Sequence, residues 1–397
     1  MQRTAGAWCR QRRFCLVAAA CAAIAGCSTA PPKPDAARVS KFSGHAYTPD
    51  EHFGVATTLA TWNLGAEICE VALTVPDKAG RFPLVIYLPG LGETRDAGSV
   101  WRTAWTQAGY AVFSIQPFAE DAKSWASPKA RTGDLVSQAR IRYSARVMSA
   151  RIETLNAAWR ELAQRQAKSE APFARIDLSR VAVAGFDLGA YTAMAMAGET
   201  IRELPKLSDT IPVAAVIALS PYADFSGATF SERYRSIHGP VLSVTTDSDA
   251  DAIGLVTAPS VRKAPFEYMP AGDKFLMLIW GVPHFVLGGN NTNAESTGAL
   301  SEAAKADSGT GAKPQSGPDT GKPQKKKLPA SENTEEDKPA AAITVISATA
   351  NAIGAAAIAG VTTAFLDAYL KKDAVASEWL DKDAPRWLRD QGEIKKK

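Results

Sequence analysis

Short apolar runs recur along the chain from about residue 54 and alternate with stretches of helical periodicity. The runs are EICEVALTV (67–75), PLVIYLP (83–89), YAVFSIQ (110–116), RVAVAG (180–185), VAAVIALS (213–220), PVLSVTT (240–246) and FLMLIWG (275–281). Several are continuously apolar, as strands buried on both faces of a parallel sheet are. Helices are predicted between them, over 98–108, 136–167 and 188–198. This alternation predicts an α/β fold with a doubly wound, mostly parallel sheet.

The longest helical stretch, 136–167, is amphipathic. Its large apolar residues lie close to one helical face and its charges lie on the other; these apolar residues are Ile141, Val147, Ile152, Leu155 and Leu162. The pattern is typical of a helix that packs one face on a core.

The first 26 residues have the pattern of a lipoprotein signal peptide. Their last charged residue is Arg13, and the apolar run 14–26 is too short to span a bilayer. The run ends in IAGC (24–27), which resembles the bacterial lipobox, in which the cysteine is lipidated and becomes the new N-terminus. Lipidated Cys27 would anchor the protein to a lipid bilayer. Because Ser28 follows, where aspartate would favour the inner membrane, we expect an outer-membrane lipoprotein of a bacterial envelope that faces the periplasm.

The composition then divides the chain. Residues 27–50 are predicted to be the lipidated cysteine and a tether, extended over the proline-rich 28–40. One domain is expected over 51–288. Residues 289–342 contain no aromatic residue and only isolated leucines, so they are predicted to be a disordered low-complexity insertion. Residues 343–390 are predicted to form a C-terminal helix that completes the domain.

The span 343–366 carries no charge and is long enough to cross a bilayer. It consists mainly of small residues, however, and continues directly into the amphipathic FLDAYLKK (365–372). We therefore favour a packed helix over a transmembrane one, with Gly354 and Gly360 allowing close packing against the sheet.

Charge and cysteine content narrow the classes of partner. Four of the 45 basic residues precede Cys27, so the chain from Cys27 onward has 41 basic and 41 acidic residues. Nothing in this charge balance indicates nucleic acid as a partner. Once the signal peptide is removed, Cys69 is the one cysteine besides Cys27, and its apolar surroundings are more typical of buried filler than of a nucleophile. No metal-ligand spacing or nucleotide-binding glycine loop is present in the sequence, so no cofactor is expected.

One short motif carries candidate chemistry. The run 180–185 continues into Gly185-Phe186-Asp187-Leu188-Gly189 and then into a small-residue helix. This is the layout of a nucleophile elbow, G-x-S-x-G, in which a sharp strand-to-helix turn exposes a serine hydroxyl. Here Asp187 holds the position of that serine.

The partners of a nucleophile on such a sheet follow it in the order acid, histidine. His284 follows the last apolar run and is the best placed of the four histidines. The acidic turn TTDSDAD follows the strand before it. Asp249 stands there where the orienting acid normally does, and Asp247 and Asp251 remain alternatives. A buried Asp249 would accept the Nδ1 proton of His284 and fix its tautomer.

Backbone donors for an oxyanion are expected at two turns. The glycine-rich YLPGLGE (87–93) would supply the N–H of Leu91, and the start of the helix after Asp187 would supply the N–H of Leu188. Ser220 follows a different strand without an elbow, and we interpret it as turn structure.

Five blocks together carry a family resemblance. They are PLVIYLPGLGETR, GFDLGAYTAMAMAG, GPVLSVTTDSDADAIGLV, MPAGDKFLMLIWGVPH and TTAFLDAYLKKDAVASEWL. In this order they resemble the dienelactone-hydrolase and platelet-activating-factor-acetylhydrolase-like branch of the α/β hydrolases, over about 55–288 and 343–390. The resemblance implies an eight-stranded sheet without a cap domain and a small ester-like substrate. The chain departs from it at Pro89-Gly90, where His-Gly is usual, and at Asp187, where relatives have serine or cysteine.

The aspartate leaves three hypotheses open. The first is an envelope-anchored ester hydrolase with a degenerate elbow, in which His284 activates water. The second is a catalytically inactive pseudoenzyme used for binding or scaffolding. The third is a hydrolase that attacks saturated carbon with Asp187, as haloalkane dehalogenases and epoxide hydrolases do. Against the third, the strands 213–220 and 240–246 leave no room for a helical cap between them, and Leu188 replaces a halide-binding tryptophan.

Overall fold

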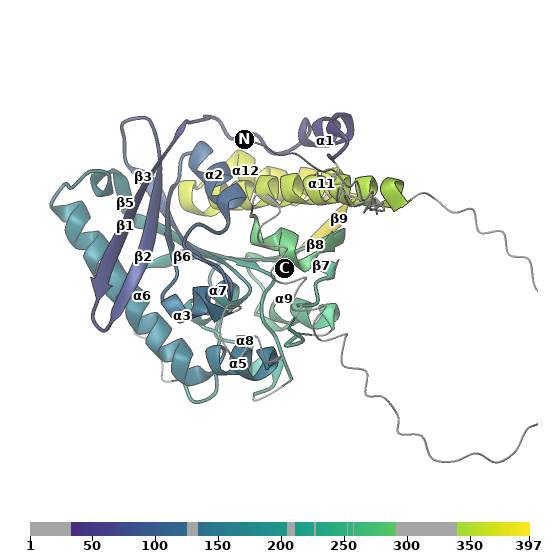
Figure 1. Ribbon diagram of the computed structural model, residues 1–397. Coiled ribbons are helices and arrows are strands. Elements are labelled where there is room, and N and C mark those ends of the chain that lie inside the picture. Colours follow the sequence, from purple (N-terminus) through teal and green to yellow (C-terminus); the bar gives the residue numbers. More distant parts are fainter. Residues whose placement is uncertain are drawn as a thin grey trace, which may run out of the picture.

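The computed structural model describes residues 33–124, 134–204, 211–225, 228–251, 253–256, 258–290 and 340–397, without the side chains of 340–346. A mostly parallel sheet lies between two layers of helices (Figure 1). The predicted α/β fold is therefore confirmed. The predicted signal peptide and Cys27 lie outside the described residues.

The strands are β1 Val55–Leu64, β2 Glu67–Pro76, β3 Phe82–Leu88, β4 Ala111–Ile115, β5 Ile176–Phe186, β6 Val213–Leu219, β7 Val241–Ser248, β8 Lys274–Pro283 and β9 Gly392–Lys396. The α-helices are α1 Ala36–Ser43, α2 Ser99–Gln107, α3 Ala119–Ala122, α5 Leu135–Arg142, α6 Ala145–Ala167, α7 Leu188–Met196, α8 Phe230–Tyr234, α9 Ala264–Tyr268, α11 Ala340–Leu366, α12 Ala374–Glu378 and α13 Ala384–Leu388. Shorter helical turns are η2 Phe173–Arg175, η3 Pro259–Lys263, η4 His284–Gly288, η5 Asp367–Lys371 and η6 Trp379–Asp383.

The strand order brings the carboxyl ends of the central strands to one edge of the sheet. The order is β1-β2-β4-β3-β5-β6-β7-β8-β9. Strands β4, β3, β5, β6, β7 and β8 pair in parallel, whereas β1, β2 and β9 are antiparallel to their neighbours. The loops after β3, β5, β6, β7 and β8 therefore lie side by side, which is where parallel sheets bind ligands.

Alternate residues of the central strands face the two helical layers. On β3, Leu84 and Ile86 belong to a core shared with α6 and α7, whereas Val85 and Tyr87 belong to a core shared with α2 and α11. This is the two-residue period of a strand buried on both faces. It explains why these runs are apolar without interruption.

The sheet has nine strands among the described residues, not the expected eight. The additional strand, β9, is a charged edge strand, and β1 at the opposite edge exposes most of its residues. Neither strand is an uninterrupted apolar run, because the exposed face of an edge strand can carry polar side chains. Apolar runs alone therefore revealed only the central strands.

The helix predicted over 136–167 is two helices. Ser144 has an extended conformation (φ −67°, ψ 151°) and begins α6 as its N-cap, so α5 ends at Arg142. Serine is a favoured residue at that position. Ile141 consequently does not join the apolar face and is 47% exposed, whereas the other four residues predicted for that face are buried. The break places Tyr143 between the two helices.

The apolar C-terminal helix packs on the body of the protein. The span Ser347–Lys371 is long and apolar enough to cross a membrane, but 78% of its most apolar window is buried inside the structure. A Cβ on Gly354 would lie 2.7 Å from Val282 of β8, which confirms the predicted packing against the sheet. The same prediction is wrong for Gly360, because an added Cβ there would meet the Trp387 ring at 3.1 Å.

The predicted extended tether is wrong for its last residues. Residues 36–43 form α1, which is capped by Asp35 and lies beside α11 (Figure 1). The Asp35 amide donates to Thr349 Oγ1 (2.8 Å), and the Phe42 ring stacks on Trp387 with centroids 4.5 Å apart. These tertiary contacts stabilise a helix in a segment whose own composition does not predict one.

The predicted insertion 289–342 lies outside the described residues over 291–339. Its first two residues are fixed to the domain: Gly289 O accepts the Val100 amide at 2.8 Å, and Asn290 Oδ1 accepts the Gly98 amide at 2.8 Å. Residues 340–342 already belong to α11. The insertion is therefore narrower at both ends than its composition indicated.

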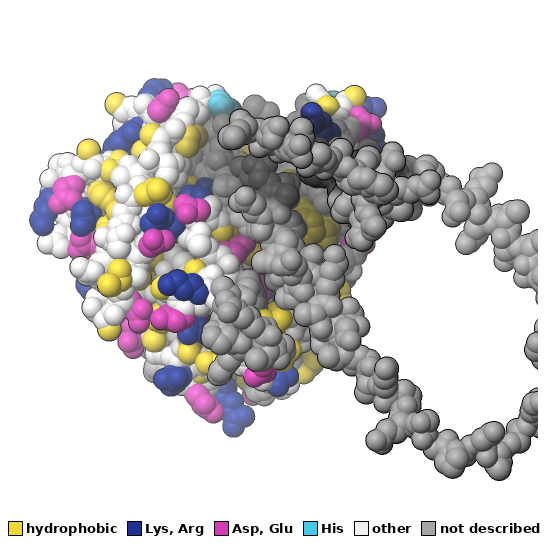
Figure 2. All heavy atoms as spheres, in the orientation of Figure 1, with side chains coloured by type: hydrophobic (Ala, Val, Ile, Leu, Met, Phe, Trp, Pro, Cys, Tyr) yellow, Lys and Arg dark blue, Asp and Glu magenta, His cyan; other side chains and the backbone are white. Residues whose placement is uncertain are grey.

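The predicted burial of Cys69 is confirmed. It is 1% exposed and free, and its Sγ lies 3.3 Å from Pro117 O. Burial raises the pKa of its thiol to about 11, which is unsuited to a nucleophile. On the face drawn in Figure 2, basic and acidic side chains are interspersed rather than gathered by sign.

Candidate active site

The turn that carries Asp187 joins β5 directly to α7. Asp187 has φ 51° and ψ −109°, a conformation that residues with a side chain rarely adopt. Its amide donates to Leu219 O at 3.0 Å, and its carbonyl accepts the Tyr191 amide at 2.9 Å. The predicted sharp strand-to-helix turn is therefore confirmed, and it holds Asp187 at the carboxyl edge of the sheet.

Two glycines allow this turn to approach its neighbours. A Cβ on Gly185 would lie 2.3 Å from the backbone of Gly189. A Cβ on Gly189 would lie 1.9 Å from Leu88 O at the end of β3. The spacing G-x-D-x-G is thus a steric requirement of the close contact between β3, β5 and α7.

His284 begins η4 after β8, and its ring is oriented by Asp249 from the turn after β7. His284 Nδ1 donates to Asp249 Oδ1 at 2.6 Å. This leaves Nε2 as the ring nitrogen available to act as a base. Of the three aspartates considered for this role, the structure brings Asp249 to the imidazole.

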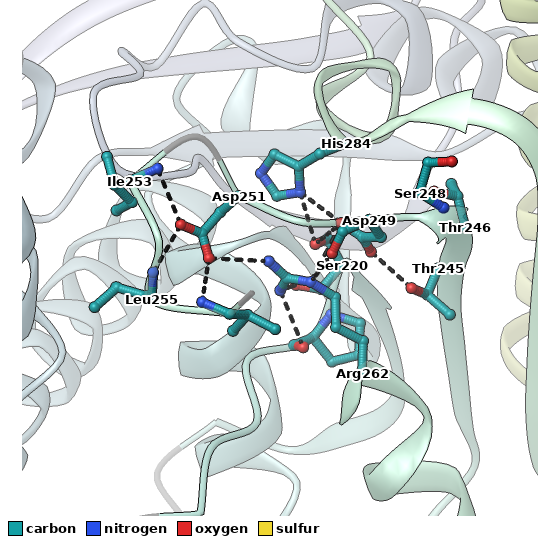
Figure 3. Close-up of polar contacts among 12 residues, drawn as sticks. Ser220, Thr245, Thr246, Ser248, Asp249, Asp251, Ile253, Leu255, Arg262 and His284 are labelled. Atoms are coloured by element: carbon teal, nitrogen blue, oxygen red, sulfur yellow. Dashed lines mark hydrogen bonds and ion pairs between the residues drawn. The ribbon is translucent and has the colours of Figure 1, made fainter. Parts of the chain in front are cut away.

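Asp249 is fully buried and surrounded by donors (Figure 3). Besides His284, Oδ1 accepts the Ser220 hydroxyl at 2.8 Å and lies 3.2 Å from Arg262 Nε, and Oδ2 accepts the Thr245 hydroxyl at 2.7 Å. Burial acts to raise the pKa of this carboxyl, but the hydrogen bond from His284 and the charge of Arg262 outweigh it and hold the pKa below its usual value.

The two alternative aspartates have other contacts. Asp247 is exposed, and its Oδ1 accepts the Gly281 amide at 2.9 Å. Asp251 accepts backbone amides of its own loop, including that of Leu255 at 2.9 Å, and lies 3.6 Å from Arg262 Nη2. Asp251 therefore shapes the loop behind Asp249 and does not contact His284 (Figure 3).

Ser220 does more than form a turn. It follows β6 with φ 56°, and its buried hydroxyl lies 2.8 Å from Asp249 Oδ1 and 3.1 Å from His284 Nδ1. Because its hydroxyl donates to the same carboxylate oxygen as His284, Ser220 helps to fix the position of Asp249. Its side chain therefore contacts both the acid and the imidazole.

The loop after β3 leaves one amide free. Within the described part of the chain, the Gly90 amide donates to Glu93 Oε2 (2.7 Å), the Gly92 amide to Asp121 O (2.9 Å) and the Glu93 amide to Gly90 O (3.2 Å). Gln116 Nε2 donates to the carbonyls of Gly90 and Glu93 from behind. The Leu91 amide has no such partner there. It is thus free for a ligand, as is the amide of Leu188, the first residue of α7.

Glu93 is a second carboxylate of this region. Its pKa is raised to about 7, mainly by burial and further by the charge of Asp187, against hydrogen bonds from Gly90 and Asn290 and the charge of His284. Asp187 and His284 thus both lie close enough to act on it. The His284 ring also packs against Phe186, the residue before Asp187, with centroids 5.0 Å apart.

Asp187 and His284 are brought to the same edge of the sheet but are not directly joined. Within the described residues, the hydrogen bonds of His284 run to Asp249 and Ser220. The Nε2 atom of His284 thus has no hydrogen-bond partner among the described residues.

A cavity of about 690 Å³ is lined by Tyr191 of α7, the helix that follows Asp187, but not by Asp187 or His284 themselves. Its wall includes Tyr143, Tyr191 and Tyr222, whose rings pack together with centroids 4.6 to 5.8 Å apart. The Tyr143 phenol oxygen is buried, and no hydrogen bond of ordinary geometry reaches it from the described residues. Burial, then the charge of Asp187 and the proximity of its carboxylate as an acceptor, raise the pKa of the phenol well above the usual value. Tyr143 therefore belongs both to the cavity wall and to the surroundings of Asp187.

No family model matches this chain, and no curated protein is significantly similar to it.

Sequence reasoning missed Arg262, Glu93 and Tyr143. Arg262 reaches Asp249 from η3, and Tyr143 reaches the site from the break between α5 and α6. No local motif marks either. Glu93 ends the glycine-rich stretch 87–93, but nothing in that spacing indicates a buried carboxylate. Among the described residues, no group of three or more His, Cys, Asp or Glu is arranged to hold a metal ion.

Proposed function

We propose that the chain is a hydrolase of the α/β-hydrolase class whose nucleophile is Asp187 and whose target is a saturated carbon bonded to oxygen. Support comes from the strand order and from the positions of Asp187, Asp249 and His284, which follow β5, β7 and β8 in turn. The observation that carries the proposal is the Tyr143 phenol, which is buried beside the Asp187 carboxylate without a hydrogen bond of ordinary geometry.

A carboxylate suits attack on saturated carbon better than acyl transfer. Acyl transfer through Asp187 would give a mixed anhydride, whereas attack on saturated carbon gives an ordinary alkyl ester. In this first step an Asp187 oxygen bonds to the carbon, the carbon–oxygen bond of the substrate breaks, and the departing oxygen takes the proton of Tyr143. A strained cyclic ether such as an epoxide fits best, because an unstrained ether is not opened by a carboxylate.

The same step strengthens Tyr143 as an acid. The charge of Asp187 raises the pKa of the phenol and keeps it protonated while the site is empty. Ester formation removes that charge, so the pKa falls when the leaving oxygen needs the proton.

The second step hydrolyses the ester. His284 Nε2 takes a proton from water, and the oxygen of that water attacks the Asp187 carboxyl carbon. The oxyanion forms next to the Leu91 and Leu188 amides. Collapse expels the diol oxygen, which takes the proton from His284, and the new Asp187 carboxylic acid returns a proton to the Tyr143 phenolate. The sum is substrate plus water giving a diol.

A cap between β6 and β7, as in the haloalkane dehalogenases, is not needed to bring an acid to Asp187. The residues between Leu219 and Val241 contain only the short α8 among the described ones. The excursion between β4 and β5, which contains α5 and α6, instead brings Tyr143 to the cavity. The Leu188 side chain has no N–H group that could bind a departing halide ion, which favours oxygen over halide as the leaving group.

Ester hydrolysis without a covalent intermediate is the second candidate. It is favoured by the His284–Asp249 pair and by the free Leu91 amide, since both can act on an ester while Asp187 stays unmodified. In that case His284 would deliver water directly to the ester carbonyl.

One experiment separates these functions. Excess purified protein is given styrene oxide or 4-nitrophenyl acetate in ¹⁸O-water, for a single turnover. Our proposal expects epoxide turnover with ¹⁸O in the Asp187 peptide and an unlabelled diol. Label only in the acetate would favour direct ester hydrolysis, and turnover of neither would leave a pseudoenzyme. Asp187→Ser is the matched variant: it should lose epoxide turnover and gain activity on the acetate.

The lipid anchor completes the proposal. We propose that Cys27 is lipidated and holds the hydrolase at the outer membrane of a bacterial envelope. Metabolic labelling with a fatty acid should mark the wild type and not Cys27→Ala, and an unlabelled wild type would refute it.

A further inference from the structure

Glu93 connects the two loops that carry the candidate oxyanion donor and the candidate base. Its Oε2 accepts the Gly90 amide at 2.7 Å, and its Oε1 accepts Asn290 Nδ2 at 2.7 Å. Asn290 Oδ1 in turn accepts the Gly98 amide at 2.8 Å, just before α2. A continuous chain of hydrogen bonds therefore runs from Gly90 through Glu93 and Asn290 to Gly98. We call these four residues the Glu93 clamp.

The Glu93 carboxylate is tightly enclosed where it sits. A Cβ on Gly90 would lie 3.2 Å from Oε2, and a Cβ on Gly288 would lie 3.2 Å from Oε1. The same two added atoms would lie 2.9 Å and 3.3 Å from the Phe186 ring. The carboxylate is thus held between two glycines and an aromatic ring, and it has little room to change its position.

This placement fixes the two sides of the site relative to each other. Gly90 directly precedes Leu91, whose amide is free. Gly288 and Asn290 lie at the end of η4, which His284 begins. A shift of either loop would therefore change the distance between the Leu91 amide and the imidazole.

We propose that Glu93 is a positioning residue of the candidate site, whose ionised carboxylate holds the Leu91 turn and the His284 segment together. The proposal goes beyond the proposed function, because the clamp is a property of the folded chain whether or not it turns over a substrate.

The charge state of Glu93 matters because both of its oxygens accept N–H donors. An ionised carboxylate satisfies Gly90 and Asn290 together, whereas a protonated one presents an O–H to one of these donors and loses that bond. Burial is the main cause that raises the pKa of Glu93; the charge of Asp187 raises it further and that of His284 lowers it. With a pKa of about 7, the clamp closes as the pH rises through neutrality.

Exchanging the two side chains tests the clamp. Glu93→Gln presents an amide to Asn290 Nδ2, and Asn290→Asp places a second carboxylate against Glu93, so each variant loses one bond. The double variant rebuilds both bonds, because the new amide nitrogen at position 93 can donate to the new carboxylate at position 290 while the amide oxygen accepts the Gly90 N–H. Glu153→Gln, on an exposed side chain of α6, is the matched control.

Hydrogen exchange reads the clamp without any substrate. At pH 8 we expect faster exchange in peptides covering both 86–95 and 284–290 in each single variant, and wild-type exchange in the double variant and in Glu153→Gln. Faster exchange in only one of the two peptides, or no recovery in the double variant, would overturn the proposal. Because this measurement needs no turnover, it stands even if the proposed function fails.

Turnover gives a second measurement if the proposed function holds. Loss of one hydrogen bond to a charged group should lower kcat about tenfold to a hundredfold in Glu93→Gln, with a smaller change in KM. On the acidic side of the pH profile of kcat, the Glu93→Gln variant should show one titrating group fewer than the wild type. The double variant should recover kcat. A role of Glu93 in proton transfer would predict no recovery in the double variant, and that result would refute positioning.

Discussion

Replacing Asp249 by asparagine tests the core of the candidate site. The side chain is fully buried and accepts His284 at 2.6 Å, Ser220 at 2.8 Å and Thr245 at 2.7 Å, with Arg262 Nε 3.2 Å away. Asparagine keeps the shape but has one acceptor oxygen, and its amide nitrogen would face donors. At least one of these groups must then lose its partner.

The magnitudes follow from these contacts. If His284 must accept a proton at Nδ1, Nε2 becomes the protonated nitrogen and is no longer a base, and in a comparable triad this costs about 10⁴ in kcat. The buried Arg262 also loses its nearest charge, which by itself costs about 3 kcal/mol of unfolding free energy. Asp251, 3.6 Å from Arg262, keeps this cost at the lower end of the usual range. The loss of activity should therefore far exceed any loss of folded protein.

The assay compares Asp249→Asn with Asp247→Asn. Steady-state hydrolysis of styrene oxide gives kcat, and urea unfolding of the same samples gives stability. Asp247→Asn should remain close to wild type in both, because its carboxylate is exposed and bonded to the Gly281 amide. An Asp249→Asn enzyme within tenfold of wild type, or an equal loss in Asp247→Asn, would refute this assignment of the acid.

Four further outcomes are expected. Tyr143→Phe should reduce epoxide turnover at least about 10²-fold in single-turnover measurements, because the variant has no phenol proton to give. Its thermal stability should not fall, because no hydrogen bond of ordinary geometry reaches the phenol from the described residues. Gly189→Ala should fold poorly, because its Cβ would lie 1.9 Å from Leu88 O; soluble yield against wild type tests it. Asp187→Asn should lower the pKa of Glu93, measured by carboxyl ¹³C NMR titration, and an unchanged pKa would mean that Asp187 does not act on it. The pKa of Glu93 is raised from 4.5 to about 7 in the folded state, so its contribution to stability is present below pH 4.5 and is lost as the pH rises through 7. On the order of 3 kcal/mol of unfolding free energy should therefore be lost between pH 4.5 and 8 in the wild type and not in Glu93→Gln, as measured by urea unfolding.

The parts of the site that the sequence predicts are those that a local pattern encodes. The turn at Asp187 follows from glycine spacing next to an apolar run, and His284 follows from its position after the last such run. Parallel strands bring these positions to one edge, so their proximity needs no knowledge of side-chain contacts. The position of Asp249 after the strand before His284 predicts it as the orienting acid, and its burial and its contact with His284 agree with that prediction.

The remaining parts depend on contacts between distant segments. Arg262 joins Asp249 across the loop that follows β7, and Glu93 meets Asn290 although the two lie far apart in sequence. The break at Ser144, which turns Tyr143 toward the cavity, lies inside an otherwise continuous helical pattern. Such features arise from packing, and a periodicity calculated along one segment contains no information about them.

The carboxylates of Asp187, Asp249 and Glu93 differ in how far neighbouring groups compensate their negative charge. This difference suits a reaction in which Asp187 becomes an uncharged ester. Asp249 is compensated by Arg262 and by hydrogen bonds, so its pKa is held below the usual value. The pKa of Glu93 is raised to about 7, mainly by burial and further by the charge of Asp187. An alkyl ester at Asp187 would remove that charge, so Glu93 would ionise more completely and close the clamp in the intermediate. The Leu91 amide would then be held most firmly in the step in which the oxyanion forms, so ester formation itself would prepare the site for hydrolysis.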